Sequence, residues 1–260
     1  MLQKIRESYQ QSKARVIFLD YDGTLVTFTK VPSEATIDAR TLNVIDLLSR
    51  ISENRVIIIS GRSNDFLEKQ FQSLKVDLIA EHGFMIREHG QVWIKTHHAE
   101  MSWRNDVWQL FERIKDHIPG TFIEEKEASL ALHYRDADPL LSAMEISNFL
   151  APIHLYKVDH PELEVMEGHK IVEIKMAGYN KGTAAVDFLK TINYDFILAL
   201  GDDVTDENLF RELPENAFTI KVGQGNSIAV YRLQFQQDVL PFLEQLTDKT
   251  IDLKEESLPL

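Results

Sequence analysis

The sequence predicts an α/β protein in which a doubly wound parallel sheet carries an inserted α+β module. Three short segments predict the sheet, at residues 15–20, 55–60 and 194–201, because each contains an unbroken apolar run followed by a polar residue or glycine. Such runs are typical of strands that are buried on both faces of a parallel sheet. The middle of the chain has a different pattern, with pairs of strands between helices, and predicts the insert.

Helical patterns separate the predicted strands of the sheet. Residues 36–53 have apolar side chains at roughly helical spacing and lie between the first two strands. Further helices are predicted at 182–190, 205–213 and 239–246, with strands between them. This alternation favours a sheet with helices on both faces. We therefore expect both ends of the chain to contribute to one sheet, with residues 1–97 and 173–260 as the core.

The insert is expected to span residues 98–172 and to follow the order αββαββ. This order suits a small antiparallel sheet with two helices on one of its faces. Its predicted elements are a helix at 103–117, strands at 121–126 and 129–135, a helix at 139–150, and strands at 153–158 and 163–166.

Composition excludes several classes of protein and partner. The chain has 28 Lys and Arg against 41 Asp and Glu, a net charge of −13, without a long basic run, so no nucleic-acid or membrane partner is expected. Apolar stretches such as 56–59 are far shorter than the roughly 20 residues of a membrane-spanning helix. The run 16–19 is too short for a secretory signal. There is no cysteine, which excludes disulfides and favours a cytoplasmic location.

Two carboxylates lie at the end of the first predicted strand, in the sequence Asp20-Tyr-Asp22-Gly23. Side chains two residues apart project to one side of a strand, and the glycine permits a sharp turn. One aspartate could then attack phosphorus while the other transfers a proton. A calcium loop would require glycine and glutamate where Leu25 and Val31 stand. A simple Asx turn after a strand remains an alternative.

Polar residues also follow the second strand and precede a later helix. Ser60 and Gly61 offer a hydroxyl and backbone amides suited to phosphate oxygens, although ordinary turn chemistry is the alternative. Lys181, at the start of a predicted helix, could neutralise both a phosphate and an aspartate, or be an ordinary surface lysine. Together with Asp20 and Asp22, these residues are expected at one edge of the sheet.

An acidic segment follows the third apolar run. Residues 201–207 contain four acidic side chains, and such crowding requires a cation or raised pKa values. Hard oxygen ligands without thiolates favour Mg²⁺. The alternative is a solvated acidic helix N-terminus, which the helix dipole stabilises.

These motifs, in this order, resemble the haloacid dehalogenase superfamily of aspartate-dependent phosphatases. Other segments are similar to the trehalose-6-phosphate phosphatase family, and the resemblance extends over about residues 15–243. The segments that carry this second similarity are Ala80-Glu-His-Gly83, Ile123-Glu-Glu-Lys126, His133-Tyr-Arg135, Val172-Glu-Ile-Lys175 and Gly201-Asp-Asp-Val-Thr-Asp-Glu207. One departure is Met176, where the family usually has proline.

The resemblance implies a haloacid dehalogenase-like Rossmannoid core, a C2B-type cap (lid) and a role for each matching residue. Asp20 would be the nucleophile, Asp22 the general acid and base, and Ser60, Gly61 and Lys181 the phosphate holders. Mg²⁺ would bind the Asp20 carboxylate, the Asp22 carbonyl and Asp202, with Asp203 and Asp206 supporting this site. The residues that would bind sugar hydroxyls are Glu124, Lys126, Arg135 and Glu173.

The predicted function is Mg²⁺-dependent hydrolysis of trehalose 6-phosphate to trehalose and phosphate, through an aspartyl-phosphate. The expected partner is therefore a small sugar phosphate, with fusion to or association with a trehalose-6-phosphate synthase as a further possibility. Alternatives are a phosphatase for sucrose, glucosylglycerol or mannosylglycerate phosphate, and a non-catalytic phosphatase-like domain. A dinucleotide-binding enzyme is excluded because the glycine-containing segment 223–228 lacks a third glycine and lies far from the first strand.

Overall fold

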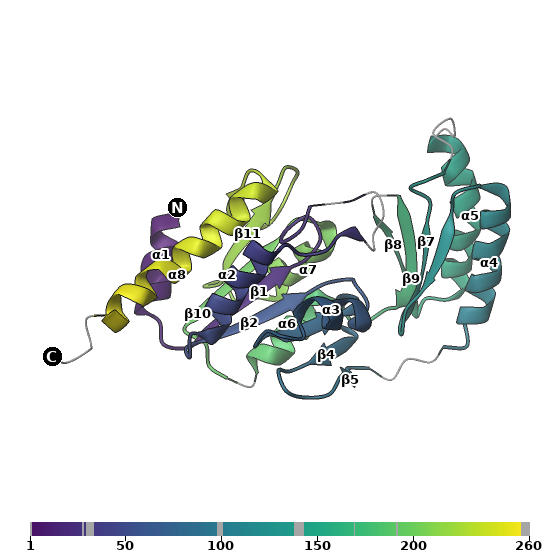
Figure 1. Ribbon diagram of the computed structural model, residues 1–260. Coiled ribbons are helices and arrows are strands. Elements are labelled where there is room, and N and C mark those ends of the chain that lie inside the picture. The colour runs from purple at the N-terminus through teal and green to yellow at the C-terminus, as the bar shows by residue number, and fades with distance from the viewer. Residues whose placement is uncertain are drawn as a thin grey trace. The chain divides into compact units, whose positions relative to one another are not determined.

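The chain forms two compact units in the computed structural model (Figure 1). The structure describes residues 2–27, 29, 34–97, 101–137, 143–168, 170–190 and 192–255. Unit 1 comprises Met1–Thr96 and Asn180–Leu260, and unit 2 comprises His97–Tyr179. No helix in these described ranges is long and apolar enough to cross a membrane.

Unit 1 is built on an eight-stranded sheet with the order β12-β11-β10-β1-β2-β3-β4-β5. The strands from β12 to β3 are parallel, whereas β4 and β5 continue the sheet as antiparallel strands. Their bounds are β1 Arg15–Asp20, β2 Asn54–Ile59, β3 Asp77–Ala80, β4 Met85–Arg87, β5 Ile94–Lys95, β10 Phe196–Gly201, β11 Phe218–Val222 and β12 Tyr231–Leu233. The predicted α/β class is thus confirmed, and the three predicted strands are the adjacent strands β10, β1 and β2.

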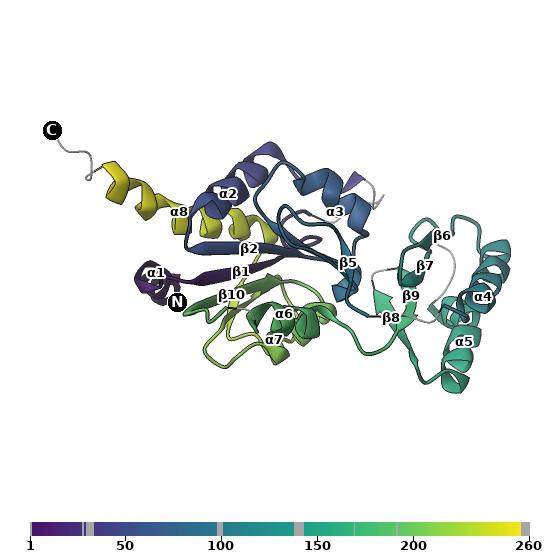
Figure 2. The same cartoon turned by 90° about the horizontal axis from the view of Figure 1, so that it is seen from below.

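Helices cover both faces of this sheet. Figure 2 shows α2, α3 and α8 on one face, and α6 and α7 on the other. The helices of unit 1 are α1 Leu2–Gln11, α2 Ala39–Arg50, α3 Asn64–Phe71, α6 Lys181–Leu189, α7 Val204–Glu212 and α8 Val239–Glu255. Side chains of β1, β2 and β10 pack with those of α6 and α7 into one buried apolar cluster, which includes Phe18, Ile57, Ala199, Phe188 and Leu209. This packing fixes both helix starts at the carboxyl edge of the sheet.

Unit 2 is a four-stranded antiparallel sheet with the order β6-β7-β9-β8 and two helices. Its elements are α4 Arg104–His117, β6 Phe122–Glu125, β7 Ser129–His133, α5 Ala143–Asp159, β8 Leu163–Gly168 and β9 Ile171–Met176. The two helices lie on the same side of the sheet (Figure 1). Their apolar side chains, such as Phe111 and Ile153, pack with Leu130 and Val172 from the strands.

One predicted strand of the insert is wrong, because residues 153–158 are the second half of α5. Leu150 and Ile153 are buried, whereas Leu155 and Val158 are 68% and 74% exposed. That spacing is helical, and the helix accommodates Pro152. The fourth strand is instead β9, so the order αββαββ is kept with different residues. The predicted exit at residue 172 falls inside β9, and the predicted helix start at residue 139 lies outside the described residues.

The segment that leaves β9 is held by a buried lysine. Lys175 is 1% exposed, and its Nζ lies 2.7 Å from the carbonyl oxygen of Tyr179 and 2.7 Å from Glu164 Oε2. The same ammonium lies 4.1 Å from the centre of the Tyr179 ring. These contacts order the chain beyond Met176, where the sequence lacks the family's proline.

Candidate active site

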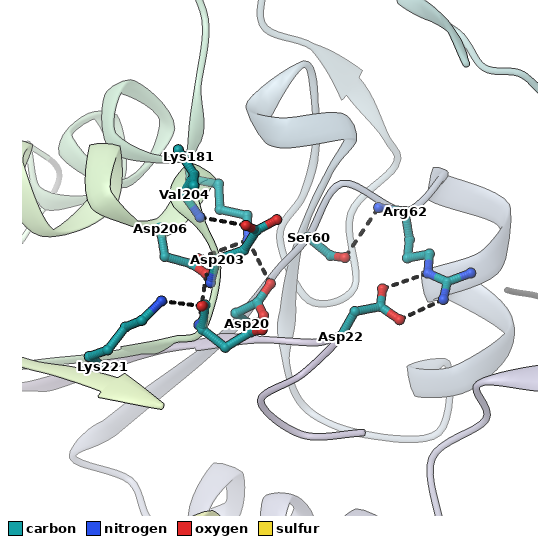
Figure 3. Close-up of polar contacts among 10 residues, drawn as sticks. Asp20, Asp22, Ser60, Arg62, Lys181, Asp203, Val204, Asp206 and Lys221 are labelled. Atoms are coloured by element: carbon teal, nitrogen blue, oxygen red, sulfur yellow. Dashed lines mark hydrogen bonds and ion pairs between the residues drawn. The ribbon is translucent and has the colours of Figure 1, made fainter. Parts of the chain in front are cut away.

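Polar side chains of unit 1 lie at the carboxyl edge of its sheet, and Figure 3 shows Asp20, Ser60, Lys181 and Asp206 among them. Asp20 ends β1, Ser60 follows β2 and Asp202 follows β10, which are neighbouring strands. Lys181 is the first residue of α6, and Asp206 lies in the first turn of α7. Parallel strands place their ligands at this edge, so the sheet order itself brings these residues together.

Lys181 connects two buried carboxylates. Its Nζ lies 2.6 Å from Asp20 Oδ1 and 2.8 Å from Asp206 Oδ1, and Figure 3 shows the lysine reaching both. All three side chains are buried. Burial lowers the pKa of Lys181, but the charges of Asp20 and Asp206 outweigh it and raise that pKa above its usual value. The lysine therefore remains cationic inside the protein.

Burial, reinforced by the charge of Asp206, raises the pKa of Asp20 well above its ordinary value. The same causes raise the pKa of Asp202 to about 7. Carboxylates whose charge is disfavoured in this way bind a cation favourably, because the cation offsets their mutual repulsion. The electrostatics of the site therefore favour positive charge beyond that of Lys181.

The carboxylates of Asp20, Asp202 and Asp206 form a group that could hold a metal ion. One oxygen from each lies within 4.8 Å of the others. Asp202 Oδ1 is buried and lacks a hydrogen-bond partner among the described residues. Buried polar atoms normally have a partner, and a bound cation would supply one. A Cβ atom at Gly23 would overlap the Asp202 carboxylate, so glycine there leaves room for this group. Three hard oxygens fit a divalent metal.

The other two predicted acidic residues have distinct positions. Asp206 Oδ2 accepts hydrogen bonds of 3.0 Å from the backbone amides of Asp202 and Asp203, and thereby shapes the loop after β10. Asp203 caps α7 and accepts a 2.6 Å hydrogen bond from the amide of Val204. Asp203 does not belong to the potential metal group, whereas Asp206 does.

Asp22 is paired with an arginine that the sequence analysis did not assign to the site. Arg62 Nε lies 2.6 Å from Asp22 Oδ2, and Nη2 lies 2.5 Å from Oδ1 (Figure 3). The guanidinium also stacks on the Phe66 ring, 4.6 Å from its centre. Ser60 is buried, and its Oγ accepts a 3.1 Å hydrogen bond from the Arg62 amide. The position of Arg62 directly after Ser-Gly is a signal that could have been used.

The predicted sugar-binding residues all belong to unit 2. Lys126 Nζ lies 3.0 Å from Glu173 Oε2, and both side chains are buried. Glu173 also accepts a 2.5 Å hydrogen bond from Ser129 Oγ, a residue that the sequence analysis did not select. Arg135 is half-buried in the turn after β7.

Glu124 makes a further pair in unit 2. Its Oε2 lies 2.7 Å from His133 Nε2, whose ring stacks on that of Phe122. Burial raises the pKa of Glu124, but the hydrogen bond from His133 and the charge of Lys126 outweigh it, so the pKa is lowered overall. The carboxylate is therefore ionised and able to accept hydrogen bonds.

Comparisons with known proteins agree with this geometry. A family model described as trehalose-phosphatase matches residues 18–238. A bifunctional trehalose-6-phosphate synthase/phosphatase from Thermoproteus tenax is 36% identical over 243 residues, which are 94% of this chain and 33% of that protein. A trehalose-phosphatase from Schizosaccharomyces pombe is 32% identical over 261 residues, with 93% and 32% coverage. The chain thus spans about a third of the length of these curated relatives.

Solved structures show the same fold. The C-terminal domain of trehalose-6-phosphate phosphatase from C. albicans matches with a TM-score of 0.88 and 29% identity, and the match covers 95% of this chain and 96% of that one. A haloacid dehalogenase-like hydrolase from Bacteroides thetaiotaomicron matches with a TM-score of 0.66 at 13% identity, which shows the fold alone. The family model and the curated relatives show that the chain belongs to the trehalose-phosphatase family.

Proposed function

We propose that the chain hydrolyses trehalose 6-phosphate to trehalose and inorganic phosphate. The observation that carries this proposal is the buried contact of Lys181 with Asp20 and Asp206, beside Asp202, in a chain of the trehalose-phosphatase family. A nucleophilic carboxylate, a cation and a set of metal ligands are what phosphoryl transfer through an enzyme carboxylate requires.

The reaction has two chemical steps. In the first, an oxygen of Asp20 forms a bond to phosphorus while the bond from phosphorus to the sugar O6 breaks. Asp22 donates the proton that the leaving sugar oxygen takes up. In the second, Asp22 removes a proton from water, whose oxygen forms a bond to phosphorus while the bond from phosphorus to the Asp20 oxygen breaks, which releases phosphate. Asp20 and Asp22 are thereby returned to their initial states.

Mg²⁺ is the metal that we propose for the acidic group. Asp20, Asp202 and the Asp22 main-chain carbonyl would hold it, with Asp206 beside them and Asp203 supporting the loop as the cap of α7. When bound, the ion neutralises charge on the oxygens of the transferring phosphoryl group. Lys181, the Ser60 hydroxyl and the Gly61 amide bind the same oxygens. These donors are held in place by the fold and stabilise the negative charge that develops during transfer.

Unit 2 supplies the recognition of the sugar in this proposal. Glu124, Lys126, Arg135 and Glu173 combine acceptors and donors, which suits the many hydroxyls of a disaccharide. The Lys126–Glu173 pair is buried and further fixed by Ser129. Side chains held in this way lose little conformational entropy on binding, which favours specific recognition.

A panel of sugar phosphates tests the proposed substrate. Phosphate release should be fastest from trehalose 6-phosphate when compared with sucrose, glucosylglycerol and mannosylglycerate phosphates, with Mg²⁺ present. A clear preference for another ester would contradict the substrate, and no release from any ester would favour a non-catalytic domain. Glu173→Gln keeps the size of the side chain but removes its charge, and it should raise KM for trehalose 6-phosphate.

We also propose that the substrate comes from a trehalose-6-phosphate synthase. One relative of this chain is a fused synthase/phosphatase, and this chain matches only 33% of its length. Fusion to a synthase, or association with one, would deliver trehalose 6-phosphate directly to the phosphatase. The absence of cysteine from the sequence suits a reducing cytoplasm, the compartment that we propose.

A further inference from the structure

The turn Glu81–Gly83, which follows β3, has an unusual backbone. Glu81 has φ 49°, His82 has φ 56° and Gly83 has φ 112°. Residues with a Cβ atom rarely adopt positive φ, and two in succession are strained. Such conformations persist only where surrounding contacts hold them, and they cluster at functional sites. The proposed chemistry assigns no role to this turn.

The turn is hydrogen-bonded to the phosphate loop, which we define as residues 60–62. The His82 amide donates to the Ser60 carbonyl at 3.0 Å, and the Glu81 amide donates to the Arg62 carbonyl at 2.9 Å. In a trans peptide the carbonyl and the following amide point in opposite directions. The bond to Ser60 therefore directs the Gly61 amide away from the turn.

The His82 side chain packs on the same loop. A Cβ atom at Gly61 would overlap Cε1 and Nε2 of the imidazole, so the ring lies directly on this glycine. The ring therefore fills the space on one side of residue 61 and limits movement of the loop. Gly61 has no positive φ, so its lack of a side chain serves this contact rather than the backbone conformation.

On its other side the turn contacts the start of α6. A Cβ atom at Gly83 would lie 2.8 Å from the Asn180 carbonyl oxygen and 2.9 Å from Ala184 Cβ. Asn180 caps α6 by accepting a 3.0 Å hydrogen bond from the Thr183 amide, and Lys181 is the next residue. One strained turn thus contacts both segments to which the proposed function assigns phosphate donors.

We infer that His82 is a positioning residue for the phosphoryl group. Its imidazole and left-handed backbone hold the Gly61 amide at a fixed place relative to Lys181. The kinetic test of this inference rests on the proposed function, because it measures hydrolysis of trehalose 6-phosphate. His82 acts through Gly61, so its loss changes how tightly phosphate is held and leaves the identity of the nucleophile unchanged.

The variant His82→Asn tests this inference, because asparagine tolerates positive φ but lacks the ring. We expect kcat/KM for trehalose 6-phosphate to fall by roughly tenfold to a hundredfold, since a displacement of about 1 Å in such a site has effects of this order. The inhibition constant of inorganic phosphate should rise in parallel, in a protein that still unfolds cooperatively. Wild-type kinetics and wild-type phosphate inhibition would overturn the inference. If His82→Asn does not fold, His82→Gly replaces it.

The chain offers a matched control and a compensating pair. Lys170 has φ 60° and is exposed in the turn between β8 and β9, so Lys170→Asn should leave kinetics unchanged. Gly61→Ala should impair activity through the clash with the ring, and adding His82→Asn should restore part of kcat/KM. A double variant no better than Gly61→Ala would overturn the contact that we infer.

A binding measurement separates this inference from the proposed function. If the wild-type protein does not hydrolyse trehalose 6-phosphate, the proposed function fails. The rise in melting temperature caused by inorganic phosphate with Mg²⁺ still tests His82. We expect a larger rise for wild type than for His82→Asn, and equal rises would overturn the inference.

Discussion

At the scale of single residues, the site depends on charges that are held out of water. Lys181 is the buried cation that faces both Asp20 and Asp206. Pairs of this kind are costly to form, yet removing one partner is more costly, because it leaves an uncompensated charge. The side chain that we propose to hold phosphate therefore also contributes to stability.

The substitution Lys181→Met should lower the free energy of unfolding by about 3–5 kcal/mol in metal-free protein, the usual cost of breaking a buried pair. Because the pKa of Asp20 is raised, this loss should shrink at lower pH, where protonation removes the uncompensated charge. Urea unfolding measures both effects. Lys190→Met, which removes an exposed pair with Asp187, is the control and should cost at most about 0.5 kcal/mol. If both variants lost the same free energy of unfolding, the buried contacts of Lys181 with Asp20 and Asp206 would not stabilise the protein as described.

The raised pKa values of Asp20 and Asp202 predict how metal-free protein responds to pH. An unfolded aspartate has a pKa of about 3.9, so the folded protein binds more protons than the unfolded chain from there up to about pH 7. Stability should therefore fall as pH rises through this window in EDTA. Because Mg²⁺ binds ionised carboxylates, its stabilisation should grow over the same range.

Thermal unfolding with EDTA or Mg²⁺, at several pH values, measures this dependence. Asp202→Asn is the informative variant, because amide and carboxylate have similar shapes and only one titrates. In EDTA, the melting temperature of this variant should fall less with rising pH than that of wild type. Mg²⁺ should also raise its melting temperature less. If the variant and wild type had the same pH dependence and the same response to Mg²⁺, residue 202 would not belong to the metal site.

The sequence was sufficient to predict that Asp20, Lys181 and Asp202 would converge, because each lies at a strand end or helix start on one edge of the sheet. It was insufficient for the pairing of Asp22 with Arg62 and for the fixing of Glu173 by Ser129. Such contacts depend on side-chain direction and on the register of neighbouring strands. Backbone patterns in a single sequence do not specify these features.

At the scale of elements, α5 shows why short apolar runs mislead. Residues 153–158 alternate enough to suggest a strand, and Pro152 suggests a break before them. The helix nevertheless continues to Asp159, because Leu150 and Ile153 reach the apolar core of unit 2 together. Tertiary packing of one helix face outweighs the local preference. By contrast, the clear helical spacing of 182–190 and 205–213 led to predictions shifted by a single residue.

The exit from β9 makes a prediction at this scale. Lys175→Met should destabilise the protein by about 2 kcal/mol, because the Tyr179 carbonyl and Glu164 lose a charged donor. Chemical denaturation measures the change, and Lys115→Met, which removes a partly exposed helical pair with Glu112, is the control from the same unit. A loss no larger than that of the control would show that Lys175 does not secure this segment.

At the scale of the whole molecule, alternation of strands and helices specified the parallel sheet and its interruption by an insert. The short strands at the edges were not predicted, since β5 has two residues and β12 has three, too few for a sequence pattern. The exit from the insert was placed at residue 172 because β9 was not recognised as part of the antiparallel sheet. The division of the chain instead falls at Tyr179, beyond that strand.

The most direct test of the account is the rate of phosphate release from trehalose 6-phosphate by Asp20→Asn. This change removes the charge of the proposed nucleophile while keeping the size of a side chain that is buried against Lys181. We predict a fall in kcat of about 10⁴-fold or more, as for other enzymes that lose their nucleophile, in a protein that remains folded by circular dichroism. Asp187→Asn, on the exposed face of α6, should keep wild-type turnover. Wild-type turnover by Asp20→Asn would contradict the account.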